Sequence, residues 1–224
     1  MSRAARAIPT ALGIVVAATA ALGVESALAT PHLDFEQAFS ARAEPARLHY
    51  RASYSLNERW HDVEVWRDSD RRLRRRTDDA IDTYVFRPRG EVEWQMVVLD
   101  LRRRIRTDVD RTNLYRIGHF TDWFGLAHSL SRPVGAYQVA AIARPRTDAR
   151  PIASCRWYAL TRGDVGSVIC WSKARGLPLL IADAEGRVQW RVRALDTAPL
   201  AKDAFAISDA GFVRNDANQD IHAD

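Results

Sequence analysis

Hydrophobic and polar residues alternate with a period of two near the start of the chain. Apolar residues take every second position from 48 to 54, as Leu48, Tyr50, Ala52 and Tyr54. Such alternation predicts a strand with one buried and one solvated face. Similar runs follow, separated only by short polar turns, at residues 59–67, 71–76, 81–86, 91–99 and 103–107. Strands this close leave no room for crossover helices, so an antiparallel meander is expected.

Two segments depart from this period and predict helices. Phe35, Ala38 and Phe39 recur at helical spacing before Pro45. A longer apolar stripe between Asp110 and Pro133 recurs at steps of three and four, which predicts a second helix at residues 112–130. Strands resume after Pro133, at residues 137–143, 152–181 and 188–195. The predicted fold class is therefore mainly β (α+β), with an N-terminal helix and one inserted helix.

The only two cysteines, Cys155 and Cys170, lie symmetrically about Arg162 and Gly163. A hairpin with an even loop over residues 161–164 would place them opposite each other, with Cα atoms about 4.5 to 5.5 Å apart, as a disulfide requires. We expect this disulfide, which would contribute about 3 kcal/mol in the chain-entropy model. Two buried free thiols are the alternative. A metal or redox pair is disfavoured because there is no CxxC motif or nearby histidine.

The N-terminus has the features of a secretory signal peptide. A short region with two arginines precedes an apolar run at residues 8–24, and a small-x-small cleavage site follows at residues 27–29. A transmembrane anchor is the weaker alternative, because the run is interrupted by proline and glycine and is shorter than the ~20 apolar residues that span a bilayer. We therefore expect a signal peptide over residues 1–29 and a single mature domain over residues 30–224, with no transmembrane anchor after cleavage. The mature domain is expected to end in a tail, residues 205–224, that grows steadily more polar. Export would also explain the disulfide.

The charge balance is mildly basic and carried by arginine. The chain has 33 lysines and arginines against 28 acidic residues, for a net charge of +5, and only Lys173 and Lys202 are lysines. The arginine and alanine content is typical of a codon-composition bias. The arginine clusters alone therefore do not indicate a nucleic-acid partner.

Several strand and turn features follow one another in a characteristic order along the mature chain. They are Val63-Glu64-Val65-Trp66-Arg67 with the following Arg-Leu-Arg strand, the Leu99-Asp100 turn, Gly176-Leu177-Pro178-Leu179 after a tryptophan-containing strand, and Phe205 followed by Gly211-Phe212-Val213. This order resembles the lipoprotein-carrier (LolA-like) family over most of the mature chain. The features concern strand order and turns and include no catalytic signature.

The resemblance implies a strongly curved, incomplete antiparallel β-barrel whose concave face is covered by helices. Carriers of this family hold acyl chains between sheet and helices, and sensor relatives use the same cavity to detect mislocalised lipoproteins. The family's buried arginine that ties sheet to helix has three candidates here, Arg71, Arg72 and Arg74. The disulfide hairpin is a departure from the carriers. The implied partner is a hydrophobic ligand or a lipidated protein in the periplasm.

Aromatic and aliphatic residues supply candidates for the wall of such a cavity. Those expected to face a hydrophobic ligand are Trp66, Trp94, Leu114, Ile117, Phe120, Trp123, Phe124 and Leu130. The alternative is that these residues fill a core with no void.

The arginine run at residues 71–76 offers a second kind of surface. Because side chains alternate in a strand, Arg72, Arg74 and Arg76 would share one face, with Arg71 and Arg75 on the other. Guanidinium groups bind phosphate and carboxylate in a forked geometry, so this set would suit anionic groups or an envelope protein partner. A solvated face paired with nearby acidic residues is the alternative.

Catalytic and metal-binding patterns are weak. His119 and Asp122 lie one helical turn apart, as an acid–base pair would, but a helix histidine held by a neighbouring carboxylate or carbonyl is the favoured explanation. Residues 216–220 copy the first ligands of a calcium loop, yet Ile221 stands where the turn needs glycine. No serine has a nucleophile motif. No catalytic residue, metal or cofactor is therefore predicted.

The sequence as a whole predicts an exported, non-catalytic periplasmic protein that holds an acyl chain or another hydrophobic ligand between a curved sheet and a covering helix. The alternative is a sensor or interaction module that binds a protein partner through its arginine-rich surface. An enzyme built on this fold is the third hypothesis.

Overall fold

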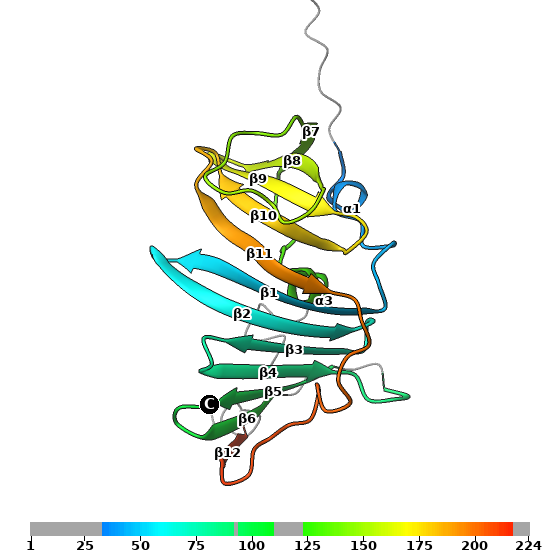
Figure 1. Ribbon diagram of the computed structural model, residues 1–224, viewed down its shortest axis with the longest axis vertical. Helices are drawn as coiled ribbons and strands as arrows, with labels where there is room; N and C mark the ends of the chain where they lie inside the picture. The colour runs from blue at the N-terminus through cyan, green and yellow to red at the C-terminus, as the bar shows by residue number, and fades with distance from the viewer. Residues whose placement is uncertain (1–32, 92–93, 110–122, 217–224) are drawn as a thin grey trace, which may run out of the picture. The chain divides into compact units, whose positions relative to one another are not determined.

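The computed structural model describes residues 33–91, 94–109 and 123–216, all within one compact unit that covers residues 31–224. Twelve strands form one sheet in the order β12-β6-β5-β4-β3-β2-β1-β11-β10-β9-β8-β7 (Figure 1). Their bounds are β1 Arg47–Leu56, β2 Arg59–Asp68, β3 Arg72–Thr77, β4 Ile81–Phe86, β5 Gln95–Asp100, β6 Ile105–Val109, β7 Gln138–Ile142, β8 Arg156–Arg162, β9 Val165–Ser172, β10 Leu177–Asp183, β11 Val188–Asp196 and β12 Val213–Asp216.

The predicted antiparallel meander is confirmed for most of the sheet. Strands β1 to β6 pair with their sequence neighbours, strands β7 to β11 do the same, and β1 joins the two halves by pairing with β11. β7 and β12 are the two ends of the strand order, so the sheet is not closed into a barrel. The mainly β, incomplete-barrel fold class is thus confirmed. At one edge, β12, which the sequence analysis did not predict as a strand, runs parallel to β6.

Two short helices accompany the sheet within the described residues. α1 spans Phe35–Ala38, and α3 spans Trp123–His128 inside the predicted second helix. The first part of that predicted helix, including Leu114, Ile117 and Phe120, lies outside the described residues, as do the predicted signal peptide and its cleavage site. Across the described residues, no helix is long and apolar enough to cross a membrane.

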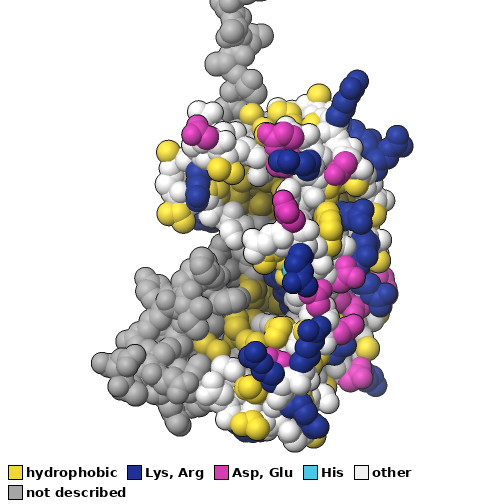
Figure 2. Space-filling model, turned by 90° about the vertical axis from the view of Figure 1, so that its left-hand side faces the viewer, with side chains coloured by type: hydrophobic (Ala, Val, Ile, Leu, Met, Phe, Trp, Pro, Cys, Tyr) yellow, Lys and Arg dark blue, Asp and Glu magenta, His cyan; other side chains and the backbone are white. Residues whose placement is uncertain are grey.

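The alternation along the strands gives the sheet two distinct faces. The face that we call the inner face carries Leu48, Tyr50, Val63 and Val65, which are buried in one cluster with Ala127 of α3. The opposite, outer face carries the intervening residues of β1 and β2, such as His49, Arg51, Glu64 and Trp66. In Figure 2, hydrophobic side chains line the hollowed side, whereas charged side chains of both signs gather on one edge of the view.

The chain after β11, which Figure 1 shows descending beside β3 and β4 toward β12, contacts the outer face, where Arg74 and Tyr84 donate to the carbonyls of Ala204 and Ala206. In this C-terminal segment, residues 197–212, Ile207 and Phe212 pack against a small cluster formed by Tyr84, Val97 and Leu99. β12 then adds to the edge of the sheet. Ile207 and Phe212 lie within the predicted polar tail, and they bury part of the outer face.

The predicted disulfide between Cys155 and Cys170 is confirmed, with Cα atoms 5.4 Å apart. The predicted register was wrong, because Trp157 is the residue paired with Cys170 and the turn falls on Gly163 and Asp164. The physical reason is the backbone of Gly163, whose φ of 55° suits a two-residue hairpin turn that needs a positive φ at its first position. Cys155 therefore lies just before β8 and reaches Cys170 diagonally.

Candidate functional site

The structure divides the predicted cavity residues among three places. Trp94 and Trp123 stack with ring centroids 4.2 Å apart and pack against the inner-face core. Phe124 and Leu130 belong to a second cluster around α1. Trp66 pairs with His49 across β1 and β2 and stacks on its ring at 5.1 Å on the outer face. The prediction that Trp66 lines the same wall as Trp94 was wrong, since its strand position points it to the opposite face.

The second cluster borders a cleft of about 280 Å³ beside α1. Phe35, Phe39 and Phe124 line the cleft together with the charged side chains of Glu36 and Arg132. Phe35 meets Phe124 edge-on at 5.7 Å, which connects α1 with α3. Phe35 and Phe39 are buried, whereas Phe124 is partly exposed. The cleft is the described feature on which a hydrophobic ligand would first be sought.

A buried arginine ties the sheet to α3, as the family resemblance implies. It is Arg67, whose side chain is 1% exposed, and not one of the predicted candidates Arg71, Arg72 or Arg74. Arg67 donates to the Ala127 carbonyl at 3.0 Å in α3.

Two further chain segments converge on the same guanidinium group. Arg67 donates to the Arg175 carbonyl at 3.1 Å, in the turn before β10. Its Nη2 lies 2.8 Å from Glu44 Oε2, close enough for an ion pair, although the angle is not that of a hydrogen bond. The Arg67 group therefore holds together β2, α3 and two loops.

His128 of α3 is buried in this cluster as a neutral ring. Its Nδ1 lies 2.8 Å from Arg67 Nη1 and also contacts the Gly176 carbonyl. Burial and the positive charge of Arg67 lower the pKa of His128 to about 4. Gly176 is required here, because its φ is 61° and an added Cβ would lie 2.6 Å from Glu44 Oε2.

This lowered pKa predicts a loss of stability in mild acid. The folded state disfavours the protonated His128 ring. The free energy of unfolding is therefore highest above the unfolded pKa of 6.5 and decreases as the pH falls toward the folded pKa of about 4. Linkage gives a decrease of about 2 kcal/mol in the free energy of unfolding from pH 7 to pH 5. Burial raises the pKa of Glu44, which offsets part of this decrease near the acid end.

The measurement is urea unfolding at pH 7 and pH 5, for the wild type and for His128→Gln. The variant removes the titrating ring while keeping a polar side chain, so its free energy of unfolding should change less between the two pH values. An equal change in both proteins would assign the pH dependence to groups other than His128.

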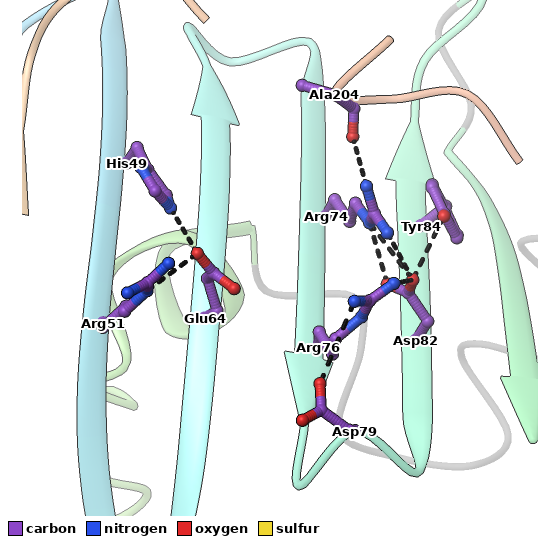
Figure 3. Close-up of polar contacts among 9 residues, drawn as sticks. All are labelled: His49, Arg51, Glu64, Arg74, Arg76, Asp79, Asp82, Tyr84 and Ala204. Atoms are coloured by element: carbon purple, nitrogen blue, oxygen red, sulfur yellow. Dashed lines mark hydrogen bonds and ion pairs between the residues drawn. The ribbon is translucent and has the colours of Figure 1, made fainter. Parts of the chain in front are cut away.

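The outer face carries a ladder of charged side chains across β1 to β4 (Figure 3). Glu64 accepts from Arg51 at 3.0 Å and lies 2.7 Å from His49 Nε2. Partial burial of Glu64 raises its pKa, but the hydrogen bonds with His49 and Arg51 outweigh this and lower it. Glu64 is therefore an anion that holds the side chains of His49 and Arg51 on the neighbouring strand.

Asp82 is the most buried acid of this ladder, with its side chain only 2% exposed. Arg74 binds both of its oxygens, with Nη2 2.7 Å from Oδ2, and Arg76 adds a contact at 3.1 Å (Figure 3). Tyr84 donates to Asp82 at 3.2 Å. Desolvation and the Asp82 charge raise the pKa of Tyr84 to about 12, so the hydroxyl keeps its proton at neutral pH.

The predicted anion-binding arginines share the outer face but differ in their availability. Arg74 is largely covered: its side chain is 14% exposed, and it also donates to the Ala204 carbonyl of the C-terminal segment. Arg72 pairs with Asp68 and is 51% exposed. Arg76 is 34% exposed and shares Asp82. Arg74 is thus part of the folded scaffold, while Arg72 and Arg76 remain accessible.

A groove of about 560 Å³ lies beside Arg76 on the outer face. Sequence reasoning missed its two most exposed cations, Arg51 on β1 and Arg193 on β11, whose side chains are 63% and 45% exposed. The groove also contains four acidic residues, Asp62, Glu64, Asp78 and Asp79. The alternation places Glu64 on the polar face of β2 and Arg51 on the polar face of β1. The sequence pattern could therefore have identified Arg51 as an outer-face cation.

Comparisons with known proteins give distant structural similarity. No protein-family model matches the chain, and no curated protein matches it in sequence. Among solved structures, the chain is similar to MucB in the MucA/MucB complex of Pseudomonas aeruginosa, with 18% identity, a TM-score of 0.42 and coverage of 77% of this chain. It is also similar to a structure of MucB, with 16% identity, a TM-score of 0.39 and the same 77% coverage.

A further similar structure is MucB in complex with MucA(peri), with 20% identity, a TM-score of 0.37 and coverage of 72% of this chain. The chain spans only 54% to 61% of the length of these MucB chains.

Proposed function

We propose that the protein is an exported, non-catalytic interaction module that binds a protein partner through the arginine-rich outer face of its sheet. The carrying observation is the groove of about 560 Å³ in which exposed Arg51 and Arg193 face carboxylates of the same chain. Exposed ion pairs contribute only about 0 to 1 kcal/mol, so these guanidinium groups can exchange an internal carboxylate for one of a partner at little cost.

An exposed aromatic side chain extends this surface along the same strands. Trp60 is 50% exposed and precedes the groove residue Asp62 by two positions on β2. Arg191 lies over its ring at 5.3 Å and precedes Arg193 by two positions on β11. Tryptophan and arginine are enriched among the residues that dominate protein–protein binding energies, so this arrangement supports a protein partner.

The proposed compartment is the periplasm. Residues 1–29 have the composition of a cleavable signal peptide. The disulfide between Cys155 and Cys170 is typical of proteins that fold in an oxidising compartment. Both features support export.

Charge reversal of the exposed arginines tests the proposal. Tagged wild-type protein and an Arg51→Glu, Arg193→Glu variant would be incubated with solubilised envelope extract of the host, and retained proteins quantified by mass spectrometry. We expect a retained partner whose recovery falls at least about tenfold in the variant, since like charges at an interface cost several kcal/mol. The melting temperature should change little, because both ion pairs are exposed.

The matched control is Arg156→Glu with Arg162→Glu, two exposed arginines on β8 that carry the same charge change. The control should retain the partner at the wild-type level. Equal recovery in all three proteins would contradict the outer-face proposal.

Lipid analysis of the same purified samples tests the second candidate function, an acyl chain or other hydrophobic ligand beside α1 and α3. A bound lipid that is lost with Phe124→Ala and kept in the outer-face variant would favour it.

A further inference from the structure

A second groove lies on the outer face where the C-terminal segment passes the ends of β3 and β4. Its volume is about 330 Å³, and four arginines but no acidic residue line it. The four arginines are Arg71, Arg72, Arg87 and Arg89, and Phe86 and Phe205 are among the apolar residues of the lining. The groove thus combines an apolar wall with a strongly cationic rim.

The apolar wall is built from two parts of the chain that are far apart in sequence. Phe86 ends β4, and Phe205 and Ile207 come from the C-terminal segment. The guanidinium group of Arg72 lies 4.5 Å from the centre of the Phe205 ring, which brings cation and aromatic ring together. All three apolar residues are only partly buried, so a ligand can contact them.

The four arginines of the rim carry more positive charge than the neighbouring acidic residues neutralise. Arg72 pairs with Asp68 at 2.5 Å, and Arg87 pairs with Asp70 at 2.9 Å. Arg71 and Arg89 are exposed, and neither forms an ion pair with any residue in the described part of the chain. Two guanidinium groups therefore remain to bind anions.

We propose that this groove binds a short acidic segment of the partner protein, with an aliphatic or aromatic anchor next to at least two carboxylates. The proposal rests on the proposed function and specifies where the partner is bound and by what chemistry. The anchor would occupy the wall formed by Phe86 and Phe205, and the carboxylates would bind Arg71 and Arg89.

The chemistry of the groove favours a peptide over an anionic lipid. The neighbouring residues Asp68 and Asp70, which do not line the groove, already pair with two of its rim arginines, Arg72 and Arg87. A volume of about 330 Å³ is at the lower end of ligand sites and suits one or two side chains rather than a whole lipid. Arginine clusters are a recurring means of recognising acidic motifs, and the fork of the guanidinium group matches carboxylate geometry.

The test is fluorescence anisotropy with a labelled peptide, Gly-Glu-Glu-Leu-Phe-Glu-Glu-Gly, titrated with the full mature protein. Two further peptides replace the glutamates by glutamines or the Leu-Phe pair by serines. We expect binding of the first peptide, at least tenfold weaker binding of either replacement, and weaker binding as salt is raised. Absence of binding, or equal binding of all three peptides, would overturn the proposal.

Variants locate the site. Arg71→Glu with Arg89→Glu should weaken binding of the first peptide at least tenfold, and Phe205→Ser should weaken it without a charge change. Arg156→Glu with Arg162→Glu is the matched control and should bind as the wild type does. If Phe205→Ser loosens the C-terminal segment, the variant with Arg71→Glu and Arg89→Glu still tests the proposal, because both arginines are exposed and unpaired in the described structure.

Two outcomes separate this inference from the function on which it rests. A partner whose capture depends on Arg51 and Arg193 but not on Arg71 and Arg89 would overturn the groove assignment and leave the function standing. Peptide binding that depends on Arg71 and Arg89, with no captured partner, would leave the groove assignment standing and overturn the proposed function. Binding to vesicles of anionic phospholipid that depends on the same two arginines, without peptide binding, would overturn the peptide class.

Discussion

Replacing Arg67 by methionine should destabilise the protein by about 3 to 5 kcal/mol. The side chain is 1% exposed, and it binds the Ala127 and Arg175 carbonyls and pairs with Glu44. Methionine fills much of the volume but leaves these three acceptors without their buried cation. The free energy of unfolding in urea at pH 7 measures the effect, and hydrogen exchange at α3 should increase because Arg67 fixes that helix to the sheet.

Two variants make this prediction specific. Arg51→Met removes an arginine from the adjacent strand, but that side chain is 63% exposed and its ion pair contributes at most about 1 kcal/mol. Adding Glu44→Gln to Arg67→Met should recover part of the lost stability, because the half-buried carboxylate is then no longer an unpaired charge. If Arg67→Met and Arg51→Met cost the same, Arg67 does not hold the sheet and α3 together.

The position of Arg67 could have been predicted from the alternation alone. In the run from Val63 to Arg67, the two valines take the apolar face of the strand, and Arg67 continues their series while Trp66 falls on the polar face. Residue type misled the prediction: Trp66 was assigned to the cavity wall, and Arg67 was not among the candidates for the buried arginine. The strand period is the stronger constraint, because a one-residue shift would bring the whole polar series of β2 into the core.

The burial of Asp82 could not have been predicted in this way. In β4, Asp82 faces outward together with Tyr84. From the sequence, an acidic residue next to arginines on this face would be expected to be solvated. Asp82 is buried because the C-terminal segment, more than 100 residues later, crosses that face and places Ala204 and Ala206 above the cluster. Local periodicity predicts which face a side chain takes, but not what later covers that face.

Replacing Asp82 by alanine should cost about 3 to 5 kcal/mol in the free energy of unfolding, because it removes the shared partner of Arg74 and Arg76. Arg74 is largely buried, and of its hydrogen bonds to described residues it would keep the one to the Ala204 carbonyl. The C-terminal segment should loosen as well, since Arg74 and Tyr84 both donate to its backbone. Urea unfolding measures the first effect, and the rate of limited proteolysis within residues 197–212 measures the second.

Asp79→Asn is the matched control, because it removes the charge and keeps a residue type suited to the positive φ of 49° at this turn position. Its carboxylate is 89% exposed and lies 3.9 Å from Arg76, so the change should cost less than about 1 kcal/mol and leave proteolysis unchanged. Faster proteolysis in Asp82→Ala with wild-type global stability would show that the ion cluster anchors only the segment. Because Phe205 and Ile207 belong to that segment, the same variant should also weaken the binding of an acidic peptide while keeping every arginine of the groove. Unchanged peptide binding despite a released segment would mean that the arginines alone form the site.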